Sequence, residues 1–156
     1  MAKNAGQAVT REELIRGLQE DLSREYQAIL AYVVYSQAIK GAQYMTIAKE
    51  LEVHASEELA HAITIAKQLD YLGAMPNATA MAVTLTEDPV KMLRADLDNE
   101  NQTIRAYRER VRQCEELGEF AVGEEIREIL RQEQEHQMDL AAALGEDVPD
   151  VSKMKR

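Results

Sequence analysis

Apolar residues recur every three or four positions over four long stretches of this chain. Such spacing is typical of amphipathic helices that bury one face against their neighbours. We therefore expect an all-α protein with four helices, over residues 11–40, 42–72, 89–117 and 119–144. Together they would form one four-helix bundle over residues 11–144, with short tails at residues 1–10 and 145–156.

Short signals at the ends of these stretches support the boundaries. Thr10 is followed three residues later by Glu13, which is the pattern of a capping box at the start of a helix. Gly41 lies between the first two helical stretches and predicts a turn. Asp88 precedes Pro89, a pair typical of a helix cap and the first helical position.

One connection is much longer than the others. The helical pattern is absent over residues 73–88, which contain proline, asparagine and several threonines. At about 3.3 Å per extended residue this segment reaches about 50 Å, the length of such a bundle. We therefore expect one long crossover that leaves the second and third helices parallel. Val83 and Leu85 alternate with threonines there, so they are expected against the bundle or a neighbouring subunit.

Composition narrows the function classes. The formal charge of −10, without an extended basic patch, argues against a nucleic-acid partner. No apolar stretch approaches the 18 residues of a membrane span, and residues 1–10 lack the apolar run of a signal peptide, so we expect a cytoplasmic protein with no membrane partner. Cys114 is the only cysteine, which excludes an intrachain disulfide and predicts an inert thiol.

A Glu-x-x-His motif occurs twice, at Glu58–His61 and at Glu133–His136. Residues three apart share a helix face, so each pair can hold one ion from one helix. Each copy also follows another glutamate, Glu25 or Glu100, at the same separation along the chain. The proposed site, both catalytic and metal-binding, therefore comprises six residues, Glu25, Glu58, His61, Glu100, Glu133 and His136.

The two halves of the chain repeat with one constant offset, which also relates Leu22 to Leu97 and Tyr32 to Tyr107. Glu25 and Glu100 lie on the apolar stripes that a bundle would bury. Buried carboxylates are costly unless they are paired or bound to a metal, and four of them would repel one another without cations. Carboxylates with imidazoles suit iron or manganese, and zinc is compatible.

At these six residues the chain resembles the ferritin-like superfamily of di-iron carboxylate proteins, and within it the bacterioferritins and ferritins. Such bundles take one glutamate from each of two helices and a Glu-x-x-His from each of the other two. The resemblance implies a ferroxidase with two iron ions per subunit that oxidises Fe(II) with oxygen or peroxide, for iron storage or detoxification. It also implies a homo-oligomer, either a shell or a dimer. Glu58 and Glu133 are the best candidates to bridge the metals, because each shares a helix with a histidine.

Two departures from the family pattern limit these expectations. Bacterioferritins hold haem through a methionine directly after the first glutamate of the first motif, and Leu59 stands there, so haem is not expected. The tail, residues 145–156, lacks the periodicity of the fifth helix of 24-subunit shells. Two alternative functions stay open: a rubrerythrin-like peroxidase or other di-metal oxidase without storage, and a non-catalytic metal-binding bundle.

The roles of several neighbouring residues are less constrained. Tyr32 is either a donor to a site carboxylate or a core tyrosine bonded elsewhere. His54 is expected to be a surface histidine paired with Glu50 or Glu57, with an accessory iron-binding role as the alternative. The third helix carries four arginines expected on a solvated or intersubunit face, namely Arg105, Arg108, Arg110 and Arg112.

Overall fold

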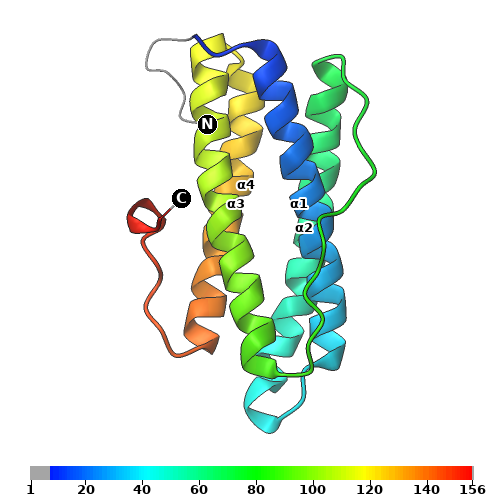
Figure 1. Cartoon of the computed structure of the whole chain (residues 1–156), viewed down its shortest axis with the longest axis vertical. Helices are drawn as coiled ribbons and strands as arrows, with labels where there is room; N and C mark the ends of the chain where they lie inside the picture. Colours follow the sequence, from blue (N-terminus) through cyan, green and yellow to red (C-terminus); the bar gives the residue numbers. More distant parts are fainter. Residues whose placement is uncertain (1–7, 156) are drawn as a thin grey trace.

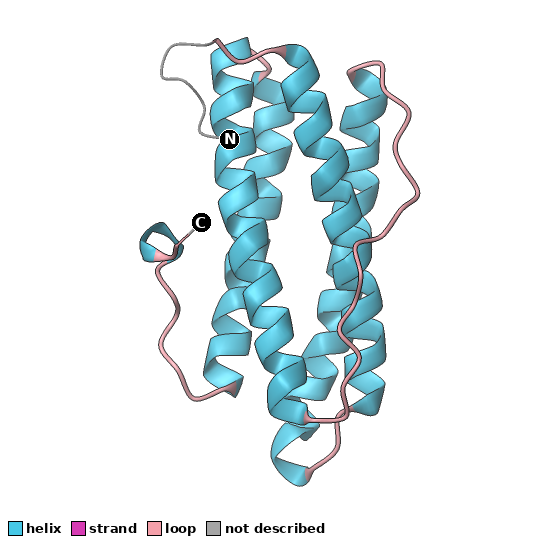
Figure 2. Ribbon diagram, in the orientation of Figure 1, coloured by secondary structure: helices cyan, strands magenta, loops and turns pink. Residues whose placement is uncertain are grey.

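The structure is a computed structural model that describes residues 8–155. Four long helices run side by side in it (Figures 1 and 2). The four are α1 (Arg11–Ala38), α2 (Met45–Tyr71), α3 (Pro89–Leu117) and α4 (Phe120–Ala143). Two short 3-10 turns accompany them, η1 (Ala42–Tyr44) and η2 (Val151–Lys153). Residues 8–155 contain no strand, which confirms the all-α expectation.

The helix ends follow the predicted signals closely. The capping box of Thr10 and Glu13 is present, and the Asp88 side chain accepts hydrogen bonds from the first turn of α3. The predicted ends of α1 and α4 extend one or two residues beyond those observed, and α2 begins three residues later than expected. The late start has a local cause, because Gly41 adopts φ 127° and leads into the 3-10 turn η1 rather than into α2.

The long crossover between α2 and α3 lies along α1 (Figure 1). Asn77 donates from its backbone and side chain to Gln19, and the Met81 backbone donates to the Ser23 carbonyl at 3.1 Å. The segment returns the chain to the far end of the bundle, so α2 and α3 run parallel, as predicted (Figure 1). Val83 packs against the core, whereas Leu85 is exposed.

Two apolar clusters form the core, one toward each end of the bundle. The first contains Leu14, Leu18 and Leu22 of α1, and the second contains Leu93 and Leu97 of α3. Fully burying one such side chain stabilises the fold by about 1.5–3 kcal/mol. Along every helix, the glutamates of the predicted site lie between the stretches that supply the two clusters. Burying these charged side chains costs folding free energy, and the apolar packing on both sides of their layer offsets that cost.

A buried ion pair joins α1 to α3 and corrects one prediction. Arg110 was expected on a solvated or intersubunit face, but it is only 7% exposed. Its Nε donates to Asp21 Oδ2 at 2.7 Å, and its Nη1 donates to Gln113 Oε1 at 2.7 Å. The guanidinium lies against Gly17, where the missing side chain leaves room for it. The prediction failed because an arginine can neutralise a buried carboxylate from another helix, which spacing within one helix does not reveal.

The C-terminal segment folds back against the bundle. Its turn η2 buries Val151 against α3, and Gln137 donates to the Pro149 carbonyl at 3.2 Å. The sequence pattern did not predict this turn. None of the helices within residues 8–155 combines the length and apolar character needed to cross a membrane.

Candidate metal centre

All six predicted site residues meet in the polar layer between the two apolar clusters. Every one is buried, with 4% or less of its surface exposed. Helices α1 and α3 supply one glutamate each, while α2 and α4 supply one Glu-x-x-His pair each. The convergence of the six side chains agrees with their predicted positions on four helices.

The six residues form two overlapping groups of four. One group contains Glu25, Glu58, His61 and Glu133, and in it one donor atom from each residue lies within 4.8 Å of the others. The second group meets the same criterion and contains Glu58, Glu133, Glu100 and His136. Glu58 and Glu133 belong to both groups. This geometry would let two cations share these two carboxylates, while each cation has its own imidazole and its own further carboxylate.

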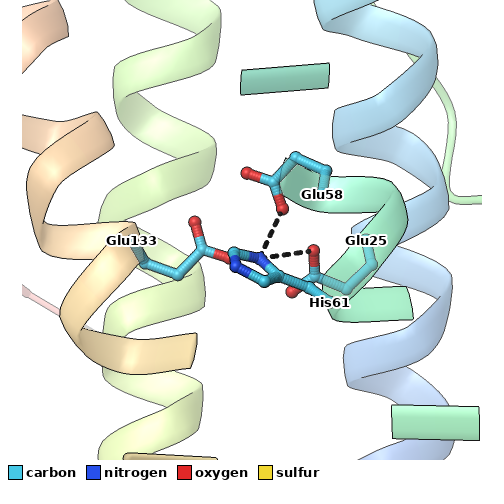
Figure 3. Close-up of side chains that lie close together, drawn as sticks. All are labelled: Glu25, Glu58, His61 and Glu133. Carbon is cyan, nitrogen blue, oxygen red and sulfur yellow. Dashed lines mark hydrogen bonds and ion pairs between the residues drawn. The ribbon is translucent and has the colours of Figure 1, made fainter. Parts of the chain in front are cut away.

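The first imidazole points its Nδ1 into the site (Figure 3). His61 Nδ1 lies 3.1 Å from Glu58 Oε2, 3.0 Å from Glu133 Oε1 and 3.6 Å from Glu25 Oε2. Its other nitrogen, Nε2, lies 2.5 Å from Gln132 Oε1. With the proton on Nε2 and donated to Gln132, the Nδ1 lone pair is available to a metal.

The second imidazole repeats this arrangement. His136 Nδ1 lies 2.8 Å from Glu58 Oε1 and 3.2 Å from Glu133 Oε2, and its Nε2 lies 2.9 Å from Glu57 Oε2. The two outer partners, Glu57 and Gln132, are themselves related by the same internal repeat. Their role was missed by the sequence analysis, although the repeat carried the signal.

Two buried tyrosines support the carboxylates that come from the opposite helix. Tyr32 of α1 donates to Glu100 Oε1 at 2.5 Å, and Tyr107 of α3 donates to Glu25 Oε1. The first contact settles the open question on Tyr32 in favour of a donor to a site carboxylate. The second was missed, even though the repeat relates the two tyrosines. Each hydroxyl fixes one carboxylate oxygen and leaves the other without a hydrogen bond.

The carboxylates strongly affect one another's ionisation. Burial, followed by the nearby charges of Glu133 and Glu25, raises the pKa of Glu58 well above its usual range. Burial and the charge of Glu133 also raise the pKa of Glu100 to about 7. Without metal, part of this cluster therefore carries protons at neutral pH.

In three other site groups the neighbouring side chains favour the charged form. Burial by itself raises the pKa of Glu25, but hydrogen bonds from Glu58 and His61 outweigh it and the pKa falls. Burial likewise disfavours the charged imidazoles, yet hydrogen bonds to the glutamates raise the pKa of His61 and His136. In the metal-free protein, protons thus balance the carboxylate charge that cations would otherwise balance.

The centre also contains polar atoms without hydrogen-bond partners among residues 8–155. The atoms are Glu25 Oε2, Glu58 Oε1, Glu100 Oε2, Glu133 Oε2 and His136 Nδ1. Most of them lie within ion-pair distance of an imidazole of the centre but are not aligned for a hydrogen bond, whereas Glu100 Oε2 has no such neighbour in the described part of the chain. A buried polar atom without a well-aligned hydrogen bond is costly, and a cation between these donors would satisfy several of them at once. Oxygen and imidazole donors of this kind match the preferences of iron, manganese and zinc. The residues therefore fit a pair of such cations.

His54 is buried, whereas the sequence pattern predicted a surface position. The prediction of a surface histidine paired with Glu50 or Glu57 is wrong, because His54 is 1% exposed and its Nε2 lies 3.0 Å from Asp139 Oδ2. Its ring stacks on His136 with the centroids 4.0 Å apart. The acceptor comes from α4, and no spacing along α2 could have identified it.

Two further expectations concern residues outside the centre. Leu59 is half exposed on α2, and the expected absence of haem at that position stays a prediction. Cys114 is fully buried, and burial raises the pKa of its thiol to about 11, which keeps it in the unreactive thiol form at neutral pH.

Two bacterioferritins are similar to this chain in sequence. The chain is 25% identical over 142 residues to a bacterioferritin of Brucella melitensis, covering 86% of this chain and 88% of that protein. A bacterioferritin of Desulfovibrio desulfuricans is 25% identical over 127 residues, which is 81% of this chain and 71% of that protein.

Solved structures show the same architecture. A ferritin-like, diiron-carboxylate protein of Bacillus anthracis superposes with a TM-score of 0.82 at 29% identity, over 86% of this chain and 96% of that one. Rhodobacter capsulatus bacterioferritin superposes with a TM-score of 0.79 at 24% identity, over 86% of this chain and 84% of that one, and supports the fold. Residues 15–147 match the ferritin family, described as a ferritin-like domain. The chain therefore belongs to the ferritin family of ferritin-like domains.

Proposed function

We propose that the protein is a ferroxidase that binds two Fe(II) ions and oxidises them with oxygen or peroxide. The observation that carries this proposal is the pair of overlapping donor groups that share Glu58 and Glu133. Each group has one imidazole whose Nδ1 faces the shared carboxylates. Two ions held side by side can together supply the two electrons that a peroxide bond needs for its cleavage.

In this proposal the six side chains have distinct roles. Glu58 and Glu133 would be shared by the two ions, while Glu25 and Glu100 would each hold one of them. His61 and His136 bind one ion each through Nδ1, because their Nε2 atoms are held from outside the centre. Each Fe(II) loses one electron, and hydrogen peroxide takes both electrons with two protons to give two waters. With oxygen as the acceptor, two electrons and two protons give hydrogen peroxide.

A surface cavity of about 280 Å³ reaches one side of the centre and supports access for Fe(II). Its charged lining is acidic on balance, with three glutamates and one arginine, namely Glu125, Glu128, Glu135 and Arg131, beside His61 and Gln132. Acidic walls raise the local concentration of cations. The Nε2 contact between His61 and Gln132 lies between this cavity and the shared carboxylates, so these two side chains would form the boundary that an entering ion passes.

Storage and assembly are the finer parts of the proposal. The relatives named bacterioferritin support iron storage or detoxification in a homo-oligomer, with Fe(II) and oxygen or peroxide as the reacting partners. The diiron-carboxylate neighbour supports two iron ions per subunit. Membership of the ferritin family and the formal charge of −10 support storage.

The proposal can be tested by loading Fe(II) without oxygen and then admitting air. We expect saturation near two irons per subunit and rapid oxidation, with both lost in the E58A/H136A variant. The exposed carboxylate of Glu12 offers a matched control, and E12Q should behave as the wild type. Equal oxidation by wild type and E58A/H136A would refute the ferroxidase. Particle mass and iron content recorded together separate storage, with many irons per subunit, from an oxidase that stops at two.

A further inference from the structure

We infer that Glu50, His54 and Asp139 form a third divalent-cation site, separate from the six-residue centre. One donor atom from each lies within 4.8 Å of the others. Glu50 and His54 are four residues apart on α2 and so share a face of that helix, while Asp139 projects from α4. This inference does not depend on the proposed ferroxidase activity.

The histidine distinguishes this cluster from an ordinary acidic surface. Glu50 and Asp139 are exposed, but His54 is 1% exposed and its Nε2 lies 3.0 Å from Asp139 Oδ2. The ring's other nitrogen, Nδ1, is buried without a hydrogen-bond partner among residues 8–155. Nε2 is the nitrogen that faces the two carboxylates, so a cation bound there would take the place of the proton shared with Asp139 and leave the ring proton on Nδ1.

Packing holds the imidazole in place for this role. The edge of the Tyr32 ring meets it with the centroids 5.0 Å apart and the planes at 78°. On another side it stacks on His136, with the planes at 26°. A ligand that is already immobilised loses little conformational entropy when it binds. The two exposed carboxylates give a cation access from solvent while the buried ring provides a rigid nitrogen donor.

The donor set indicates the chemical class of the ligand. One imidazole and two carboxylates suit a divalent transition metal such as Zn(II), Mn(II) or Fe(II), with water completing the coordination. The two carboxylate charges balance one divalent cation. Because His54 stacks on His136, the third site adjoins the six-residue centre on its α2 and α4 side.

Zn(II) counting by native mass spectrometry tests this inference without any redox step. We expect the wild type to bind three zinc ions per subunit and E50Q/D139N to bind two. Both substitutions replace exposed side chains with groups of similar shape, so the fold should survive, which circular dichroism would verify. The matched control is E52Q, since Glu52 is an exposed carboxylate on α2 outside the cluster.

A second variant separates this inference from the ferroxidase proposal. E58Q/E133Q removes the two shared carboxylates of the six-residue centre and should retain one zinc ion per subunit. Equal zinc counts for wild type and E50Q/D139N would overturn the third site, whatever the centre does. If the wild type bound only one zinc ion and E50Q/D139N bound none, the result would support the third site and count against a pair of cations at the six-residue centre.

Discussion

Replacing Gly17 with alanine is expected to destabilise the protein, although alanine is the better helix former. An added Cβ would lie 2.6 Å from Arg110 Nε and closer still to Cζ and Nη1. The guanidinium is the end of a flexible side chain, so the backbone need not move. The guanidinium cannot move, however, and keep its 2.7 Å hydrogen bonds to Asp21 and Gln113.

The size of the effect follows from the contacts that would be lost. Removing one partner of a buried ion pair costs about 3–5 kcal/mol. Asp21 would keep its 3.1 Å bond from Arg24, which reduces that cost. Alanine in a helix interior stabilises the folded state by about 0.5–1 kcal/mol relative to glycine, which offsets part of the loss. We therefore expect G17A to lower the free energy of unfolding by about 1–3 kcal/mol, and the Tm by about 2–12 °C.

Urea unfolding of the metal-free protein would measure this change, with R110L as the second arm of a double-mutant cycle. Leucine lacks the guanidinium, so G17A in the R110L background should be stabilising by about 0.5–1 kcal/mol. A G17A substitution that destabilises the wild type but stabilises R110L would show that the clash with the Arg110 guanidinium causes the loss. A neutral or stabilising G17A in the wild-type background would refute the argument, because it would show that Arg110 moves aside at no cost.

Two further predictions concern the metal centre. Y107F removes the hydroxyl that donates to Glu25 and should weaken Zn(II) binding about 10–100-fold in isothermal titration, whereas Y71F, at an exposed tyrosine, should leave it unchanged. The carboxylates raise the pKa of His61 and His136, so both imidazoles carry protons at neutral pH that a metal must displace. Zn(II) binding at pH 7 should therefore release more than one proton per subunit, and affinity should rise with pH; affinity that falls as pH rises would contradict this sign.

The sequence predicted which six side chains converge because these residues are repeated. One constant offset relates the two Glu-x-x-His motifs and the two glutamates that precede them, so four helices with equal spacing had to bring them to one level. The same repeat relates Tyr32 to Tyr107 and Glu57 to Gln132, and the structure gives each pair equivalent contacts. Reading the repeat beyond the ligands would have found these supporting residues.

The predictions for His54 and Arg110 were wrong because each side chain is paired with a residue of another helix, and the repeat does not relate the two partners. His54 is bonded to Asp139 of α4, and Arg110 to Asp21 of α1. A polar residue alone on a helix is usually solvated, so spacing within one helix favoured exposure for both. Burial of each side chain depends on the relative rotation of two helices, which is a property of packing. The turn η2 was missed for the same reason, because Val151 is ordered by its contact with α3.

The central claim is that the six converging side chains hold two cations bridged by Glu58 and Glu133. Anomalous diffraction from crystals soaked in Zn(II) tests it most directly. We expect two peaks in the polar layer, one at about 2.0–2.1 Å from His61 Nδ1 and the other at the same distance from His136 Nδ1, with both shared carboxylates between them. A single peak in the polar layer, or peaks bound to the Nε2 atoms of His61 and His136 in place of their Nδ1 atoms, would contradict the account.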